Sequence, residues 1–188
     1  MKFQIRLLLP IALVFFFAQT YPALGETLKI GFNIPLSGEF RVVGNNAKQT
    51  GDLILKQVND IGGFDINGTF HKLDFIYNDN QSSQAEASNQ VLDLVSKKQV
   101  IAIVGPLSSR QAVPAGNMAN SFSTPLISPW STSPATTKNR PFVFRSGYLL
   151  EVQAPVLTKF IAKEFHVTKA AVLYDIVSTY PRTMAKGF

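Results

Sequence analysis

The side chains of this sequence best suited to chemistry are serine and threonine hydroxyls that follow short apolar runs. They are Ser37, Ser108, Ser109, Ser128, Ser131, Thr132 and Ser133. A single Ser or Thr in such a place ordinarily caps a helix or a turn. Several hydroxyls at neighbouring strand ends, together with the backbone carbonyls near Trp130, can instead bind a carboxylate and an ammonium group. This pattern describes a site for a free amino acid.

Ser108 and Ser109 stand where a sheet edge captures small anions. Residues 101–104 form an unbroken apolar run, typical of a parallel strand covered on both faces, and Gly105-Pro106 ends it. In open α/β sheets, ligands bind beyond the carboxyl ends of the strands, where a helix N-terminus offers unpaired N–H groups. We therefore predict that the two serines begin a helix that faces the ligand.

The predicted elements alternate along the chain. Strands are predicted at 28–34, 64–66, 73–77, 100–104, 126–127, 142–144 and 170–174, with helices at about 47–61, 82–97, 112–122, from 151 onward and from 179 onward. Helices between successive strands predict a mostly parallel sheet with right-handed crossovers, which is an α/β, Rossmann-like fold. Asn67-Gly68 is predicted to form a turn, and the glycosylation sequon Asn67-Gly-Thr69 is the alternative.

Residues 1–25 are predicted to be a secretory signal peptide. Basic residues precede an apolar stretch at 7–18, and Ala23-Leu-Gly25 supplies small residues for cleavage. A membrane-spanning helix needs roughly 20 consecutive apolar residues, and this stretch is shorter. The chain also has no cysteine for a lipid anchor. We therefore expect a periplasmic protein with no stable membrane anchor after the signal is removed.

Several function classes are disfavoured by what the sequence lacks. Without cysteine there is no thiol nucleophile, disulfide or thiolate metal site, and no nucleotide-binding or hydrolase signature occurs. A net charge of +6 without long basic runs argues against nucleic acid as a partner. The only histidines, His71 and His166, are expected at the amino edge of the sheet, away from Ser108 and Ser109. We expect a binding protein rather than an enzyme, with no metal and no cofactor, and an exported serine hydrolase is the alternative.

Seven segments, in combination, resemble the branched-chain amino acid ABC transporter substrate-binding proteins, which include the leucine/isoleucine/valine-binding proteins. They are Ile30-Gly-Phe-Asn-Ile-Pro-Leu-Ser-Gly38, Val58-Asn-Asp-Ile-Gly-Gly63, Tyr77-Asn-Asp79, Gly105-Pro-Leu-Ser-Ser109, Thr124-Pro-Leu-Ile-Ser-Pro129, Ser131-Thr-Ser-Pro134 and Phe144-Arg-Ser146. The resemblance covers nearly all of the chain after residue 25. It implies the type I periplasmic binding fold, in which two α/β lobes close over an amino acid that is passed to a membrane permease.

The resemblance also implies a division of the chain and a set of contacts. Residues 26–148 correspond to the N-terminal lobe and residues 149–188 to the beginning of a second lobe, so the chain looks like a fragment of the family's usual length. The implied ligand-binding residues are Ser108, Ser109, Trp130, Ser131, Thr132 and Tyr180. Ser109 is implied to bind the carboxylate and Thr132 both charged groups. The Trp130 backbone carbonyl is implied to bind the ammonium, and Tyr180 to reach the ligand from the second lobe.

Two residues depart from the pattern of that family. Val43 stands in the loop where many relatives have an aromatic residue, which predicts a lower or absent wall of the side-chain pocket. Trp130 replaces a small residue after Ser-Pro, and its ring is expected either to cap the ligand or to cover the surface of the lobe. A second reading of the same lobe, as a ligand sensor that contacts a signalling protein, stays open at this point.

Overall fold

A parallel five-stranded sheet forms the centre of the computed structural model, which describes residues 23–187. Its strands lie in the order β5-β2-β6-β7-β8 and all neighbouring pairs are parallel. The bounds are β2 (Leu28–Ile34), β5 (Leu73–Asp79), β6 (Ala102–Val104), β7 (Leu126–Ser128) and β8 (Val143–Arg145). The predicted α/β fold is confirmed. Because the chain winds in opposite directions from β2, the crevice between β2 and β6 is the place where such sheets bind ligands.

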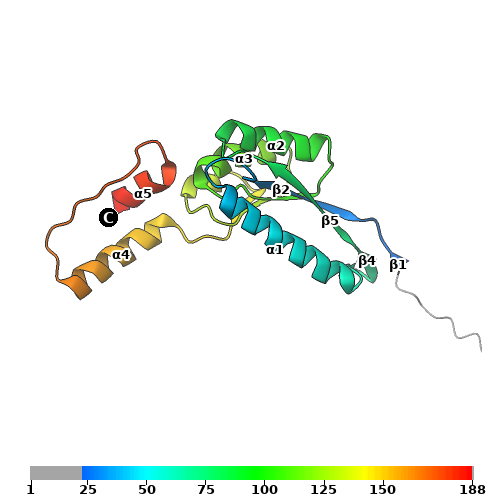
Figure 1. The fold of residues 1–188 in the computed structure, drawn as a ribbon, viewed down its shortest axis with the longest axis horizontal. Helices are drawn as coiled ribbons and strands as arrows, with labels where there is room; N and C mark the ends of the chain where they lie inside the picture. The colour runs from blue at the N-terminus through cyan, green and yellow to red at the C-terminus, as the bar shows by residue number, and fades with distance from the viewer. Residues whose placement is uncertain (1–22, 188) are drawn as a thin grey trace, which may run out of the picture.

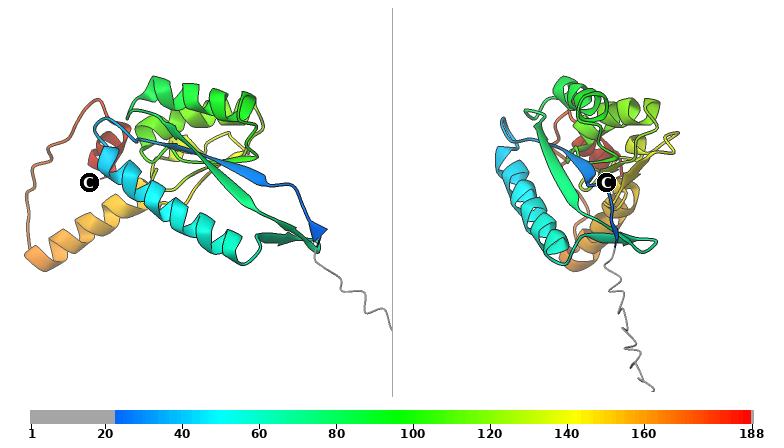
Figure 2. Two further views of the ribbon diagram at one scale, coloured as in Figure 1. Left: turned by 45° about the vertical axis from the view of Figure 1, so that its right-hand side comes forward. Right: turned by 90° about the vertical axis from the view of Figure 1, so that its right-hand side faces the viewer.

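Helices cover both faces of this sheet (Figures 1 and 2). α1 (Arg41–Asp60) packs on one face over a cluster that includes Phe32, Ile34 and Leu107. α2 (Gln84–Ser96) and α3 (Ser109–Ser121) pack side by side on the other face, and their apolar residues form the larger core with strand residues. Gly44 allows α1 to approach closely, because a Cβ there would lie 1.8 Å from the Pro35 carbonyl oxygen.

A smaller sheet extends the lobe at the end opposite α4 (Figure 1). β3 (Phe64–Ile66) and β4 (Thr69–His71) form an antiparallel hairpin, and β1 (Ala23–Leu24) adds to β4 in parallel. Asn67 and Gly68 both have positive φ, 53° and 84°, so the predicted turn is confirmed. The predicted signal peptide ends at residue 25. Its residues 1–22 lie outside the described residues, and Ala23–Leu24 near its end form β1.

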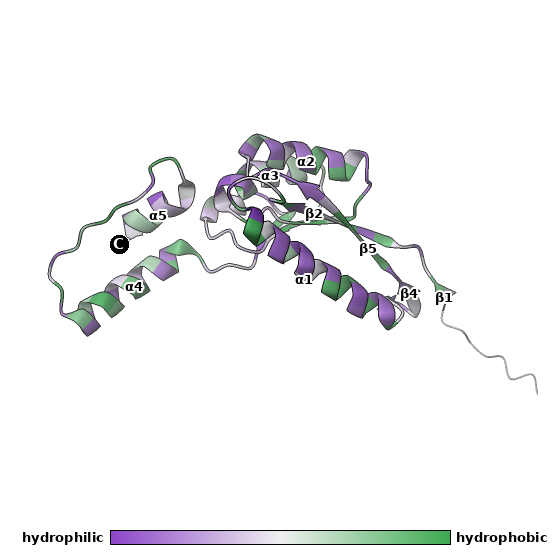
Figure 3. Cartoon of the chain, in the orientation of Figure 1, coloured by the Kyte–Doolittle hydropathy of each residue, from purple (hydrophilic) through white to green (hydrophobic). Residues whose placement is uncertain are grey.

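The chain beyond β8 projects from the lobe as two helices, α4 (Leu150–Phe165) and α5 (Thr179–Gly187), joined by an irregular segment. The strand predicted at 170–174 is wrong, because that segment is irregular and exposed, with Leu173 fully in solvent. A strand needs a neighbour to complete its hydrogen bonds, and no strand of the described residues lies beside this segment. Figure 3 shows hydrophobic residues along α4 and this segment. No helix within residues 23–187 is long and apolar enough to cross a membrane.

Smaller differences concern burial. Ala112, Ala115 and Ala119 are fully buried, as the helical spacing predicts, but Phe122 is 41 % exposed. The reason is that α3 ends at Ser121, so Phe122 is its C-cap residue and lies beyond the stripe that faces the sheet.

Candidate ligand-binding site

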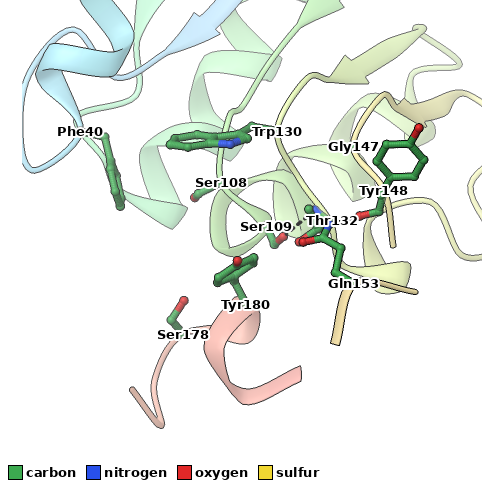
Figure 4. A pocket seen from close by; sticks show the side chains of 10 residues that line it. All are labelled: Phe40, Ser108, Ser109, Trp130, Thr132, Gly147, Tyr148, Gln153, Ser178 and Tyr180. Atoms are coloured by element: carbon green, nitrogen blue, oxygen red, sulfur yellow. Dashed lines mark hydrogen bonds between the residues drawn. The ribbon is translucent and has the colours of Figure 1, made fainter. Parts of the chain in front are cut away.

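A cavity of about 470 Å³ lies beyond the carboxyl ends of the central strands (Figure 4). Its walls are built by the loop after β2, the start of α3, the loop after β7, the segment before α4, and the start of α5. The lining residues are Phe40, Ser108, Ser109, Trp130, Thr132, Gly147, Tyr148, Gln153, Ser178 and Tyr180. The volume falls within the range usual for small-molecule sites, and no Asp, Glu, Lys or Arg of residues 23–187 lines the cavity.

The N-terminus of α3 faces this cavity without a side-chain cap. Ser108 is the N-cap residue, but its Oγ does not accept a hydrogen bond from the helix; it donates to Gln111 Oε1 at 2.9 Å. The N–H groups of Ser109 and Arg110 have no acceptor among residues 23–187. Two donors at the positive end of the helix dipole are therefore available to an anion.

The Ser109 hydroxyl is held by the loop that follows β7. Its Oγ accepts hydrogen bonds from Ser131 Oγ at 3.0 Å and from the N–H groups of Thr132 and Ser133 at 3.2 and 3.3 Å. Ser131 Oγ is in turn paired with Thr136 Oγ1 at 2.6 Å. These contacts occupy the lone pairs of Ser109 Oγ, so its own O–H is left to donate into the cavity.

Thr132 has a buried hydroxyl without a partner. The residue is only 8 % exposed, and Thr132 Oγ1 makes no hydrogen bond, although it lines the cavity beside Ser109 (Figure 4). A buried, unpaired hydroxyl costs on the order of 1–3 kcal/mol, so such a group normally has a partner. A ligand oxygen in the cavity would satisfy it.

A chain of buried amides fixes the Ser108 side chain from behind. Gln111 Nε2 donates to Asn80 Oδ1 at 3.1 Å, Asn80 Nδ2 donates to Asn33 Oδ1 at 3.0 Å, and Asn33 Nδ2 donates to the Ala87 carbonyl at 2.7 Å. The three amides are at most 1 % exposed. Because each is donor to one neighbour and acceptor from another, the direction of the chain from Ser108 to α2 is fixed.

The structure brings most of the predicted site residues together. Ser108, Ser109, Trp130, Thr132 and Tyr180 all line the cavity, while Ser131 is fully buried behind Ser109 and does not. The Trp130 carbonyl accepts no hydrogen bond within the described part of the chain, so it is available to a donor.

The other hydroxyls expected at the site have structural partners instead. Ser128 Oγ donates to the Pro106 carbonyl, Ser133 caps the short helix η1 (Pro134–Thr136), and Ser37 lies beside Asp79. The expected convergence of hydroxyls from three strand ends is therefore wrong for the first loop. That loop contributes an aromatic ring, Phe40, instead.

Several lining residues were missed by sequence reasoning. Phe40 follows the Ser37-Gly38 turn directly, and its place in the loop after the first strand was the available signal. Val43, expected in the loop, lies in α1 instead, where it packs against the core and does not line the cavity; Phe40 supplies a ring there. Gln153 reaches the cavity because the N–H of Leu150 bonds to the Thr132 carbonyl at 3.2 Å and fixes the start of α4.

Asp79 holds the loop that carries Phe40. Its Oδ1 accepts from the N–H groups of Leu36 and Ser37 at 2.8 and 3.1 Å. Burial raises the pKa of Asp79, but hydrogen bonds from the Ser37 hydroxyl and from backbone N–H groups outweigh that effect, so the pKa lies below its ordinary value. The carboxylate is thus ionised near neutral pH and acts as a fixed anchor for the loop.

The two histidines of the chain lie away from the cavity. His71 lies in β4, where its Nδ1 contacts the Glu26 carbonyl at 2.8 Å, and His166 caps the far end of α4. Neither lines the cavity, so neither is placed to activate Ser108 or Ser109. Among the described residues, no group of three or more His, Asp or Glu side chains is placed to hold a metal ion.

Comparison with known proteins agrees with this geometry. The family described as "Periplasmic binding protein" matches residues 27–188. The chain belongs to the periplasmic binding protein family. This assignment confirms the resemblance drawn from the sequence motifs, and the family consists of solute-binding proteins.

Individual relatives of this periplasmic binding protein agree. The leucine-, isoleucine-, valine-, threonine- and alanine-binding protein of Pseudomonas aeruginosa is 28 % identical over 83 % of this chain and 41 % of its own length. The branched-chain amino acid transporter substrate-binding protein LivJ of Streptococcus pneumoniae, solved with isoleucine, has a TM-score of 0.79 and 29 % identity over 86 % of this chain and 45 % of its own. The leucine-binding protein LivK of Thermotoga maritima shares the fold, with a TM-score of 0.76 at 23 % identity over 86 % of this chain and 44 % of its own. The chain thus spans less than half the length of these relatives.

Proposed function

We propose that this protein is the substrate-binding component of an ABC transporter and binds an amino acid, branched-chain or similar, by its carboxylate and ammonium groups. Three groups in one wall of the cavity support the proposal: the free N–H donors at the start of α3, the Ser109 hydroxyl and the unpartnered Thr132 hydroxyl. Together they form a carboxylate site without a competing negative charge.

The ammonium group and the surroundings of the ligand follow from the same geometry. The Trp130 carbonyl oxygen accepts a hydrogen bond from the ammonium group of the ligand. Tyr180 approaches from α5 on the opposite side of the cavity. Ser131, behind Ser109, positions that hydroxyl rather than touching the ligand. In this proposal residues 26–148 are the lobe that grips the ligand and residues 149–188 begin the opposing lobe.

The proposal includes location and partners. Residues 1–25 act as a signal peptide, the protein works in the periplasm, and a membrane permease receives the ligand. No step of this function makes or breaks a covalent bond, so the protein is not an enzyme. The names of the relatives, which bind leucine, isoleucine and valine, support the ligand class.

Binding can be measured by titrating the ¹⁵N-labelled protein with L-leucine and following backbone amide shifts. We expect shifts centred on Ser109, Arg110 and Thr132. The dissociation constant should be of the order of 1 mM, or about 4 kcal/mol, because Trp130 and Tyr180 leave one side of the cavity open. Leucinamide, which lacks the carboxylate, should not shift these amides.

Matched variants separate the site from general effects. Thr132→Val and Ser109→Ala should each weaken leucine binding about tenfold, since a hydrogen bond to a charged group contributes about 1.5–3 kcal/mol. Ser121→Ala, at the other end of α3, should leave binding unchanged. If leucine shifts no amide of the cavity, or if Ser121→Ala weakens binding as much as Ser109→Ala, the proposed site is wrong.

A further inference from the structure

Three aromatic side chains from separate segments line one end of the cavity. Phe40 comes from the cap of α1, Trp130 from the loop after β7, and Tyr180 from α5 (Figure 4). Trp130 is 56 % exposed and Tyr180 45 % exposed, so these rings are not packed into the core. Apolar rings left in solvent around a cavity mark a surface that a ligand can cover.

The rings leave space between them instead of packing against one another. No ring contact joins Phe40, Trp130 or Tyr180 among the described residues. Inside the lobe, by contrast, the Phe32 ring lies 4.8 Å from that of Phe75 and 4.9 Å from that of Tyr77. The cavity rings are therefore unpaired aromatic faces, each able to contact a ring placed between them.

Most of the polar lining residues and three of the four aromatic rings lie toward different ends of the cavity. Ser109, Thr132 and Gln153 gather at one end, where Tyr148 also lies, and Ser108 lies between them and the aromatic end, which includes the hydroxyl of Ser178 beside Tyr180 (Figure 4). In the described part of the chain, no charged side chain lines the aromatic end. A ligand that fills both ends has a carboxylate at the polar end and an uncharged, flat group at the other.

We propose that the preferred ligand is a carboxylate that carries an aromatic ring, with the ring held among Phe40, Trp130 and Tyr180, rather than a branched aliphatic amino acid. This inference rests on the proposed carboxylate site at Ser109 and Thr132. Trp130 is the main determinant of the preference, because its indole is the largest exposed ring in the wall. The indole thus caps the ligand and does not simply cover the lobe.

The decisive comparison uses pairs of ligands of similar size, with L-leucine as the branched aliphatic reference. The purified protein is titrated with L-phenylalanine, L-cyclohexylalanine and L-leucine, and with 3-phenylpropanoate and 3-cyclohexylpropanoate, which lack the ammonium. Trp130 is the only tryptophan of the chain, so its fluorescence reports directly on the aromatic end. Each aromatic ligand should bind about 3- to 10-fold tighter than its saturated partner, as expected for one or two ring contacts. If L-phenylalanine binds more tightly than 3-phenylpropanoate, the ammonium group contributes to binding.

Variants test the assignment to Trp130, and their binding is followed by backbone amide shifts because the fluorescent side chain itself is replaced. Trp130→Leu keeps apolar bulk and should abolish the preference for phenylalanine over cyclohexylalanine, whereas Trp130→Phe should retain it. Phe122→Leu, an exposed aromatic at the far end of α3, is the control and should change nothing.

The outcomes separate this inference from the proposed function. Equal affinities within each pair of ring and saturated ligands, with amide shifts still centred on Ser109 and Thr132, would overturn the aromatic preference and leave the carboxylate site intact. If neither phenylalanine nor leucine shifts those amides, the proposed function itself fails. A preference that survives Trp130→Leu would also overturn the role of the indole.

Discussion

A single side chain, that of Gln111, determines the orientation of the Ser108 hydroxyl. A serine at an N-cap usually accepts from the helix N–H groups, and here its hydroxyl is turned toward Gln111 Oε1 instead. The donors at the start of α3 are left for the ligand as a result. The buried amides thus maintain an uncapped helix end, which is unfavourable for the helix and useful for binding an anion.

Replacing Gln111 tests this arrangement. Gln111→Leu removes the partner of Ser108, which then can turn to cap α3 and compete with the ligand carboxylate. We expect leucine or phenylalanine binding to weaken about 3- to 10-fold and the free energy of unfolding to fall by about 1–3 kcal/mol, because Asn80 loses a buried donor. Amide titration and urea denaturation measure the two effects separately.

A second variant distinguishes positioning from loss of stability. Asn117 lies on the exposed face of the same helix. Asn117→Ala removes one exposed hydrogen bond from Arg140, so the free energy of unfolding should fall by less than about 1 kcal/mol and the affinity should not change. Unchanged affinity in Gln111→Leu, at full occupancy of the folded state, would contradict a positioning role for the amide chain.

The position of the loop between β2 and α1 depends on one carboxylate from a neighbouring strand. Asp79, at the end of β5, binds the backbone of Leu36 and Ser37, and Ser82 binds the N–H of Phe40 at 3.0 Å. Two adjacent segments of the sheet edge therefore set the position of the Phe40 ring.

Acid should release this loop. Because the folded pKa of Asp79 is lowered, its contribution to stability is fully present above the unfolded pKa, about 3.9, and is lost as pH falls through the lower folded pKa. Asp79→Asn should lower the free energy of unfolding by about 1–2 kcal/mol at pH 7 and have a smaller effect near pH 3. Glu39→Gln, in the same loop, whose side chain makes none of these contacts, is the control. An equal effect of Asp79→Asn at both pH values would contradict this account.

The elements show which features a sequence can predict. The run 101–104 predicts a strand because a parallel strand buried on both faces is apolar throughout, and the α/β order follows from this strand and its predicted neighbours. The same apolar run locates Ser108 and Ser109, because they follow the point where the strand ends. Whether a strand forms at 170–174 depends on a neighbouring strand that local pattern does not contain. The role of Phe40 depends on the Asp79 and Ser82 contacts, which join residues about 40 positions apart.

At the scale of the whole molecule, buried apolar contacts are concentrated before residue 150. The main cluster joins α2 and α3 to the strands β6, β7 and β8. α4 and the segment after it have few buried residues: Val156 is 63 % exposed, Phe160 54 % and Leu173 fully exposed. α5 contacts α4 and the neighbourhood of α3, and there it presents Tyr180 to the cavity. One wall of the site is therefore carried by the least buried part of the described chain.

Stability should be distributed in the same uneven way, which hydrogen exchange followed by NMR or mass spectrometry can measure. Amides of α4, α5 and residues 166–178 should exchange at least about tenfold faster than those of α2 and α3, because opening them exposes little apolar surface. Leu94→Ala, at a fully buried position of α2, should lower the free energy of unfolding by about 2–5 kcal/mol, and Leu173→Ala by less than about 0.5 kcal/mol. A saturating aromatic carboxylate should slow exchange around Tyr180, since it joins α5 to the lobe through the cavity. Uniform protection across residues 28–187, or a large loss of stability in Leu173→Ala, would show instead that α4 and α5 fold as one cooperative unit with the sheet.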